Sequence, residues 1–242
     1  MALDKPLMEW VRRRALTTRC LRSTSLTPFS TLQLEAYTFK AESRIDRDPH
    51  GLGARVYAKL AQRMLENGTT AASVFGTISV EAKCVQFPLL VALVLYPADS
   101  HALRSLVLAK AFLDAGLRGQ IGKVAMDQHS IPTYVETTSS SLSSTRSFIS
   151  AVRELVAPLA PEQQIVEPVV TPRFVPTCTL ELLRGLSALA RETGARIQSH
   201  MCESEGMVRV CKDMLGGKSD VEVLNEVRLS FSLLDCAGRR RA

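Results

Sequence analysis

An imidazole and a carboxylate stand three residues apart in the segment IQSHMCESEG. His200 and Glu203 follow a run in which apolar and polar residues alternate, as in a half-buried strand. A histidine at a strand end can bind a metal ion, although it is more often a hydrogen-bonded surface residue. A glutamate there is also typical of a solvated turn or of the first turn of a helix, where the helix dipole favours negative charge. Taken alone, the pair leaves both a metal site and an ordinary loop open.

Polar residues also end the two preceding strand-like segments. Arg173 and Phe174 end the run VTPRF, and Asp127 and Gln128 end the run GKVAMDQ. If these strands are parallel, their carboxyl ends meet at one edge of the sheet and face one mouth. The alternatives are ordinary ones: Arg173 as an ion-pair partner, and Asp127 and Gln128 as loop residues.

The segments that must position these side chains alternate between the hydrophobic pattern of a helix and that of a strand. Helical periodicity or composition predicts helices, and short apolar or alternating runs predict strands. This order predicts a parallel sheet with helical crossovers, and no glycine-rich phosphate loop follows any strand. The expected fold class is therefore α/β, a partial (β/α)8 barrel with its chemistry at the carboxyl ends of the strands. The predicted helices are 55–68, 109–119, 139–158, 178–195 and 205–217, and the predicted strands are 69–78, 120–128, 165–174 and 196–203.

Local signals predict where several helices begin and end. Asn67 and Gly68 are expected to stop the helix 55–68, and Gly119 to close the helix 109–119. The serine-rich start of the helix 139–158 can cap its free N–H groups. At the start of the predicted helix 178–195, the pair Cys178-Thr179 is interpreted as a cap.

Composition limits the class of protein. The 242 residues are 46% hydrophobic and 22% charged, which predicts one globular domain over 1–242. The net charge of +6 comes from the arginine-rich segments 11–33 and 228–242, and the rest is slightly acidic, so we expect no nucleic-acid partner.

Cysteine spacing and hydropathy indicate the compartment. Six cysteines lack CxxC or Cys/His zinc spacing, which predicts reduced thiols and a cytoplasmic location. The start of the chain lacks the apolar core of a signal peptide. The apolar run within 84–105 is too short and too rich in proline signals to span a membrane, so we expect no membrane partner.

Two motifs in order carry a family resemblance. VTPRF followed by IQSHMCESE resembles the guanine deaminases of the amidohydrolase superfamily, and LENGTTAASVFGTI and GKVAMDQ are similar to them as well. The resemblance implies a distorted (β/α)8 barrel that hydrolyses guanine to xanthine and ammonia with one Zn²⁺ ion. It implies that His200 binds the metal, that Glu203 shuttles protons, and that Arg173 and Phe174 hold the purine. It also implies a possible homodimer.

The same comparison shows departures from the family pattern. The family's HxH pair after the first strand and its later His and Asp ligands have no counterpart in this chain, so His200 alone matches a zinc ligand. Segments 11–33 and 84–105 interrupt the similarity, and 228–242 leaves it; we expect all three to be irregular. Our hypothesis is that they are translated introns, and the alternative is lineage-specific surface loops.

These departures predict that the chain as written, an incomplete barrel, neither binds zinc tightly nor turns over guanine. The first functional interpretation remains a zinc-dependent guanine deaminase, impaired in this chain. An alternative of a different class is an inactive fragment or a non-catalytic binding partner. A further alternative is another amidohydrolase that acts on a different amino-substituted heterocycle.

Overall fold

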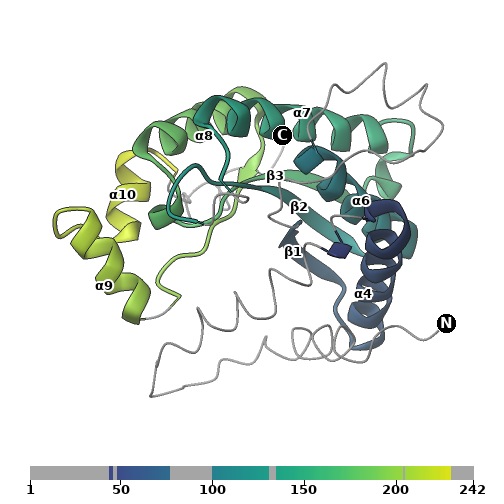
Figure 1. Ribbon diagram of the computed structural model, residues 1–242. Helices are drawn as coiled ribbons and strands as arrows, with labels where there is room; N and C mark the ends of the chain where they lie inside the picture. The colour runs from purple at the N-terminus through teal and green to yellow at the C-terminus, as the bar shows by residue number, and fades with distance from the viewer. Residues whose placement is uncertain (1–43, 46–47, 77–99, 131–134, 204, 230–242) are drawn as a thin grey trace, which may run out of the picture.

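The computed structural model describes residues 44–45, 48–76, 100–130, 135–203 and 205–229. Helices and strands alternate along these ranges (Figure 1). In chain order the elements are η2 (Pro49–Gly53), α4 (Ala54–Glu66), β1 (Ala71–Phe75), α6 (Ser100–Ala115), β2 (Arg118–Ala125), α7 (Thr138–Val156), η4 (Pro161–Gln163), β3 (Val166–Pro172), η5 (Val175–Thr177), α8 (Leu180–Thr193), β4 (Arg196–Ile197), α9 (Glu205–Met214) and α10 (Asp220–Glu226).

Four strands form one parallel sheet in the order β1-β2-β3-β4. Val74 of β1 pairs with Ile121 of β2, which pairs with Pro168 of β3. The predicted parallel sheet with helical crossovers is therefore confirmed. In the described ranges the sheet is open at β1 and at β4, as expected for part of an α/β barrel.

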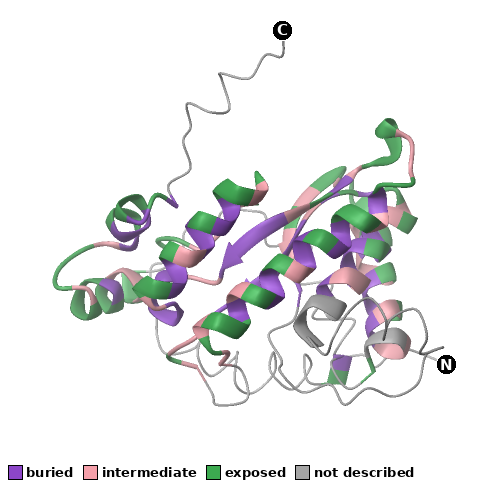
Figure 2. Cartoon of the chain, turned by 90° about the horizontal axis from the view of Figure 1, so that it is seen from above, coloured by how far each residue is buried: buried purple, intermediate pink, exposed green. Residues whose placement is uncertain are grey.

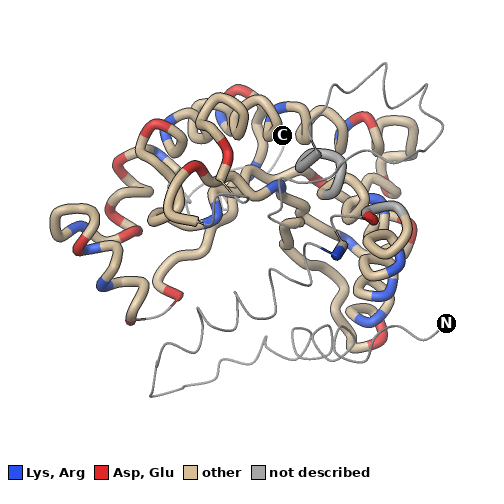
Figure 3. Tube along the Cα trace, in the orientation of Figure 1, with Lys and Arg blue, Asp and Glu red and all other residues tan. Residues whose placement is uncertain are grey.

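The helices α4, α6, α7 and α8 cover one face of this sheet, each packed beside the next (Figure 1). Their buried residues lie on the sides that face the strands, while their outer sides are exposed (Figure 2). Lys, Arg, Asp and Glu are interspersed along the described helices (Figure 3). This amphipathic pattern is what burial of a helix against a sheet requires.

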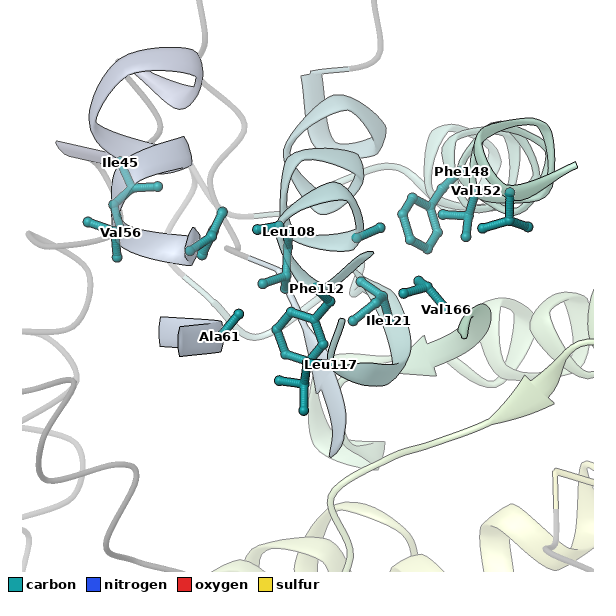
Figure 4. Packing of buried hydrophobic residues seen from close by; sticks show 14 residues of the cluster. Ile45, Val56, Ala61, Leu108, Phe112, Leu117, Ile121, Phe148, Val152 and Val166 are labelled. Carbon is teal, nitrogen blue, oxygen red and sulfur yellow. The ribbon is translucent and has the colours of Figure 1, made fainter. Parts of the chain in front are cut away.

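One of two large apolar clusters in the described residues fills the space between α4, α6, α7 and the sheet (Figure 4). Phe112 of α6 and Phe148 of α7 are fully buried in it. They pack with Ile121 of β2 and Val166 of β3 in the same cluster. Burying one such side chain contributes about 1.5–3 kcal/mol. Apolar burial therefore holds the three longest strands to their helices.

The helix α4 ends as predicted, and α6 does not. Glu66 ends α4, and Gly68 follows with a φ of 82°. The helix α6 ends at Ala115, where Gly116 has a φ of 73°, so the prediction that Gly119 closes this helix is wrong. Gly119 lies in β2, and a Cβ there would stand 2.6 Å from Phe112. Its small size serves the packing of that ring.

The segment 196–203 is less regular than predicted. Strand β4 contains Arg196 and Ile197 alone, and Cys202 has a φ of 48°, which ends the extended backbone. The helix α10 was not predicted. Ser219 and Glu222 form a capping box at its start, and that spacing could have revealed it.

The segment 11–33, residues 84–99 and residues 230–242 lie outside the described residues. Residues 100–105 of the predicted irregular segment 84–105 form the start of α6. At the other end, Leu229 is buried beside α8 and α10. Among the described helices, none combines the length and the apolar character that a membrane crossing requires.

Candidate active site

His200 lies just past the end of β4, half-buried, and is held by its neighbour strand. Its backbone N–H donates to the carbonyl oxygen of Arg173 over 3.1 Å. Its Nδ1 lies 3.3 Å from the same oxygen. The imidazole meets the ring of Phe75 edge to face, with ring centroids 5.2 Å apart and an interplanar angle of 84°. The end of β1 and the end of β3 thus fix this side chain together.

The contact at Nδ1 has a chemical consequence. A carbonyl oxygen can accept but not donate, so a hydrogen bond at this position requires the proton on Nδ1 of His200. In the neutral ring the Nε2 atom then carries the free lone pair. Histidines that bind metals usually donate their other ring N–H to such an acceptor, so this arrangement is compatible with metal binding through Nε2.

Arg173 and Phe174 follow the end of β3 in extended backbone. The Arg173 N–H donates to the carbonyl oxygen of Ala125 over 3.1 Å. The Arg173 guanidinium carbon lies 5.3 Å from the centroid of the Phe174 ring, a cation–π distance. One guanidinium nitrogen also lies 3.7 Å from the sulfur of Met126. Both side chains are half-buried at the carboxyl end of the sheet.

The structure brings His200 and Arg173 together, and joins Arg173 to Phe174. It does not bring Glu203 into this group. Glu203 is exposed in the loop before α9 and makes no ion pair or hydrogen bond within the described part of the chain. Its carboxylate is therefore available to a ligand or to solvent, three residues after the histidine.

Asp220 holds the loop between the two motif residues, a role that the sequence reasoning missed. This fully buried carboxylate accepts from the N–H of Cys202 over 2.7 Å, and the Cys202 thiol donates to its other oxygen over 3.3 Å. The hydrogen bond to Asp220, followed by desolvation and by the negative charge of Asp220, raises the pKa of Cys202. The thiol therefore stays protonated near neutral pH. Asp220 lies 18 residues away in the sequence, so no local signal could have indicated this contact.

Asp127 and Gln128 have structural partners, in agreement with their interpretation as loop residues. The Asp127 carboxylate accepts from the backbone N–H of Thr179 over 2.7 Å and from the hydroxyl groups of Thr179 and Thr138 over 2.6 and 2.7 Å. It thereby joins the starts of α7 and α8. Thr179 also caps α8, as predicted, through the N–H of Leu182.

The described residues do not make a complete zinc site by themselves. A catalytic zinc ion normally has three protein ligands. Within the described ranges, no group of three or more His, Cys, Asp and Glu residues could hold a metal ion. His200 fits the role of one ligand through its oriented Nε2 atom.

The comparison with known families and proteins agrees with these strands and motifs. The family model described as the amidohydrolase family matches residues 3–235. A guanine deaminase of Dictyostelium discoideum is 36% identical over 202 residues, covering 84% of this chain and 38% of that protein. A guanine deaminase of Rattus norvegicus is 32% identical, covering 76% of this chain and 34% of that protein. The chain thus spans less than two fifths of the length of these relatives.

Two solved structures are similar to this fold. The guanine deaminase of C. acetobutylicum, with guanine bound in its active site, has a TM-score of 0.58 and 25% identity, covering 80% of this chain and 39% of that one. An atrazine chlorohydrolase of Arthrobacter aurescens, complexed with zinc, has a TM-score of 0.60 and 15% identity, covering 88% of this chain and 43% of that one. At 15% identity the second likeness concerns the fold alone.

Proposed function

The chain belongs to the amidohydrolase family, and from that premise we propose that it carries part of the site of a hydrolase that deaminates guanine. The observation that supports this most directly is the pairing of His200 with the backbone of Arg173 at adjacent strand ends. It joins the two motifs that the guanine deaminase resemblance rests on.

The proposed reaction is a hydrolysis. Water adds to the purine carbon that bears the amino group, and that group leaves as ammonia, so that guanine and water give xanthine and ammonia. In this proposal the Arg173 guanidinium donates to the ring carbonyl and the Phe174 ring stacks on the flat base. Glu203 carries a proton from the attacking water to the ring nitrogen and then to the leaving amine. Its exposure and its lack of an ion pair among the described residues leave its carboxylate free for this work.

Zinc belongs to the same proposal. A bound Zn²⁺ ion supplies a water that loses its proton near neutral pH. His200 would provide one ligand through Nε2. Homodimer formation is proposed on the resemblance alone, and a cytoplasmic location on the spacing of the cysteines.

Binding of the base tests this proposal on the chain as it exists. We expect guanine to shift the NMR signals of His200 and Phe174 in the 242-residue protein. Adenine, which lacks the ring carbonyl, should shift them far less. Arg173→Gln should weaken the guanine effect at least tenfold, because a charge-assisted hydrogen bond is worth about 1.5–3 kcal/mol. Arg196→Gln, an exposed arginine at the opposite end of β4, is the matched control.

Equal responses to guanine and adenine, or an unchanged response in Arg173→Gln, would contradict the assignment to guanine. A response to other amino-substituted heterocycles in place of guanine would support the alternative amidohydrolase. Turnover is a separate measurement. We expect no ammonia release from guanine by this chain, and release that Glu203→Gln abolishes would show that expectation to be wrong while supporting the role of Glu203.

A further inference from the structure

Gln198 lies two residues before His200, and its side chain forms hydrogen bonds across the sheet. Its Nε2 donates to the carbonyl oxygen of Val74 over 3.0 Å and to the hydroxyl oxygen of Thr171 over 2.9 Å. Its Oε1 accepts from the hydroxyl group of Ser73. One side chain from the residue after β4 therefore bonds to β3 and to β1, although β2 lies between β3 and β1.

A glycine in β2 makes this crossing possible. A Cβ at Gly122 would stand 2.6 Å from Nε2 of Gln198 and 1.9 Å from the hydroxyl oxygen of Thr171. Any side chain at this position would occupy the space through which the Gln198 amide passes. Gly122 is thus required by close approach of other groups, as is common for glycine in a strand interior.

Gln198 and His200 contact neighbouring residues of β1. Gln198 bonds to Ser73 and Val74, and His200 contacts Phe75, the next residue of β1. Backbone pairing of β4 involves β3 alone in the described ranges, over two residues. Among the described residues, the hydrogen bonds that join this segment directly to β1 are therefore those of the Gln198 side chain.

We propose that Gln198 is a positioning residue for His200. By tying the segment after β4 to β1 across Gly122, it sets the distance at which the imidazole meets Phe75 and so the direction in which Nε2 points. Whether the direction of Nε2 serves metal binding rests on the proposed function. The positioning itself concerns the protein without metal or substrate and can be tested separately.

The test follows the NMR signals of the His200 ring in the 242-residue protein labelled with ¹³C-histidine. Phe75→Leu defines the reference, because it removes the ring current that Phe75 exerts on His200. We expect Gln198→Leu to move the His200 signals most of the way toward their Phe75→Leu positions. Ser73→Ala, which removes one of the three bonds, should produce a smaller shift in the same direction.

Gln120→Leu is the matched control. Gln120 lies on β2 in register with Ser73 of β1 but is not a bonding partner of Gln198, and the substitution is chemically the same. It should leave the His200 signals at their original positions, even if its urea midpoint falls as far as that of Gln198→Leu. This comparison separates positioning from a general loss of stability. Gly122→Ala should reproduce the Gln198→Leu shift, because the added methyl displaces the amide.

Unchanged His200 signals in both Gln198→Leu and Ser73→Ala would overturn the proposal. It would also be overturned if Gln120→Leu caused an equal shift, or if Phe75→Leu caused none. If Gln198→Leu does not fold, the Ser73→Ala result decides. None of these outcomes depends on guanine or zinc, so the guanine-binding proposal stands or falls on its own experiment.

Discussion

Two regions of the molecule are held together in different ways. From α4 to β3, helices and strands share a continuous apolar core, in which Phe112 and Phe148 are fully buried. From β4 to α9, apolar contact is thinner. Val210 and Met214 of α9 are 47% and 41% exposed, and Cys211 is the buried residue of that helix. In this region side-chain hydrogen bonds hold the chain in place. They join Asp220 to Cys202 and Gln198 to β1 and β3.

The difference matters because the second region carries His200 and Glu203. Apolar burial supplies much free energy but little direction, whereas a hydrogen bond supplies modest free energy and a defined geometry. The packed sheet gives a rigid support, and the segment at its carboxyl end is held by hydrogen bonds of defined geometry. This arrangement suits an active site. Such segments lie at the low-stability end of a protein and are the first to open locally.

The largest expected effect is in the packed region. Phe112→Ala should lower the free energy of unfolding by about 3–5 kcal/mol, because it leaves a cavity between α6 and the sheet. Val210→Ala in α9 is the comparison and should change it by no more than about 0.5 kcal/mol. Urea unfolding of both variants measures this. Similar losses in the two would mean that the regions are packed alike.

A smaller loss of stability is expected for the hydrogen bonds between Asp220 and Cys202, which hold the loop between His200 and Glu203. Asp220→Ala should cost about 1–3 kcal/mol, since it removes the acceptor of the Cys202 N–H. It should also speed the exchange of that amide and lower the pKa of the Cys202 thiol, so that iodoacetamide reacts with it faster at pH 8. Asp213→Ala, an exposed aspartate of α9, is the control. If amide exchange and alkylation of Cys202 are as slow in Asp220→Ala as in wild type, Asp220 does not hold this loop.

The smallest effect concerns pH, at the boundary between the regions. Burial, and next the charge of Asp127, raise the pKa of Cys178 from 9.0 to about 12. The unfolded chain releases this proton at a lower pH than the folded chain, so stability falls as pH rises from about 9 toward 12. The contribution at pH 10 should be about 1.4 kcal/mol below that at pH 8. Cys178→Ala should lose this part of the pH dependence, whereas Cys202→Ala should retain it. Equal slopes for wild type and Cys178→Ala would contradict the burial of this thiol in the folded state.

Much of the fold could be predicted because it follows local rules. Helical periodicity and the Asn67-Gly68 stop indicated α4, and Thr179 was recognised as the cap of α8. Gly119 was misread, since its meaning lies in the ring of Phe112 rather than in its neighbours. The strand 196–203 was predicted too long: it pairs with β3 over two residues, although β3 continues to Pro172, and the positive φ of Cys202 ends the extended backbone.

The amino-acid sequence by itself determined the alternation of strands and helices, the placing of His200 and Arg173 after successive strands, and the resemblance that their motifs carry. Tertiary structure decided which of these residues meet. It seated His200 between Phe75 and the carbonyl of Arg173, left Glu203 exposed, and gave Gln198 and Asp220 their partners. The physical reason is that periodicity and capping depend on residues a few positions apart. The bonds that orient the site join residues up to 125 positions apart, and only the packed sheet brings those together.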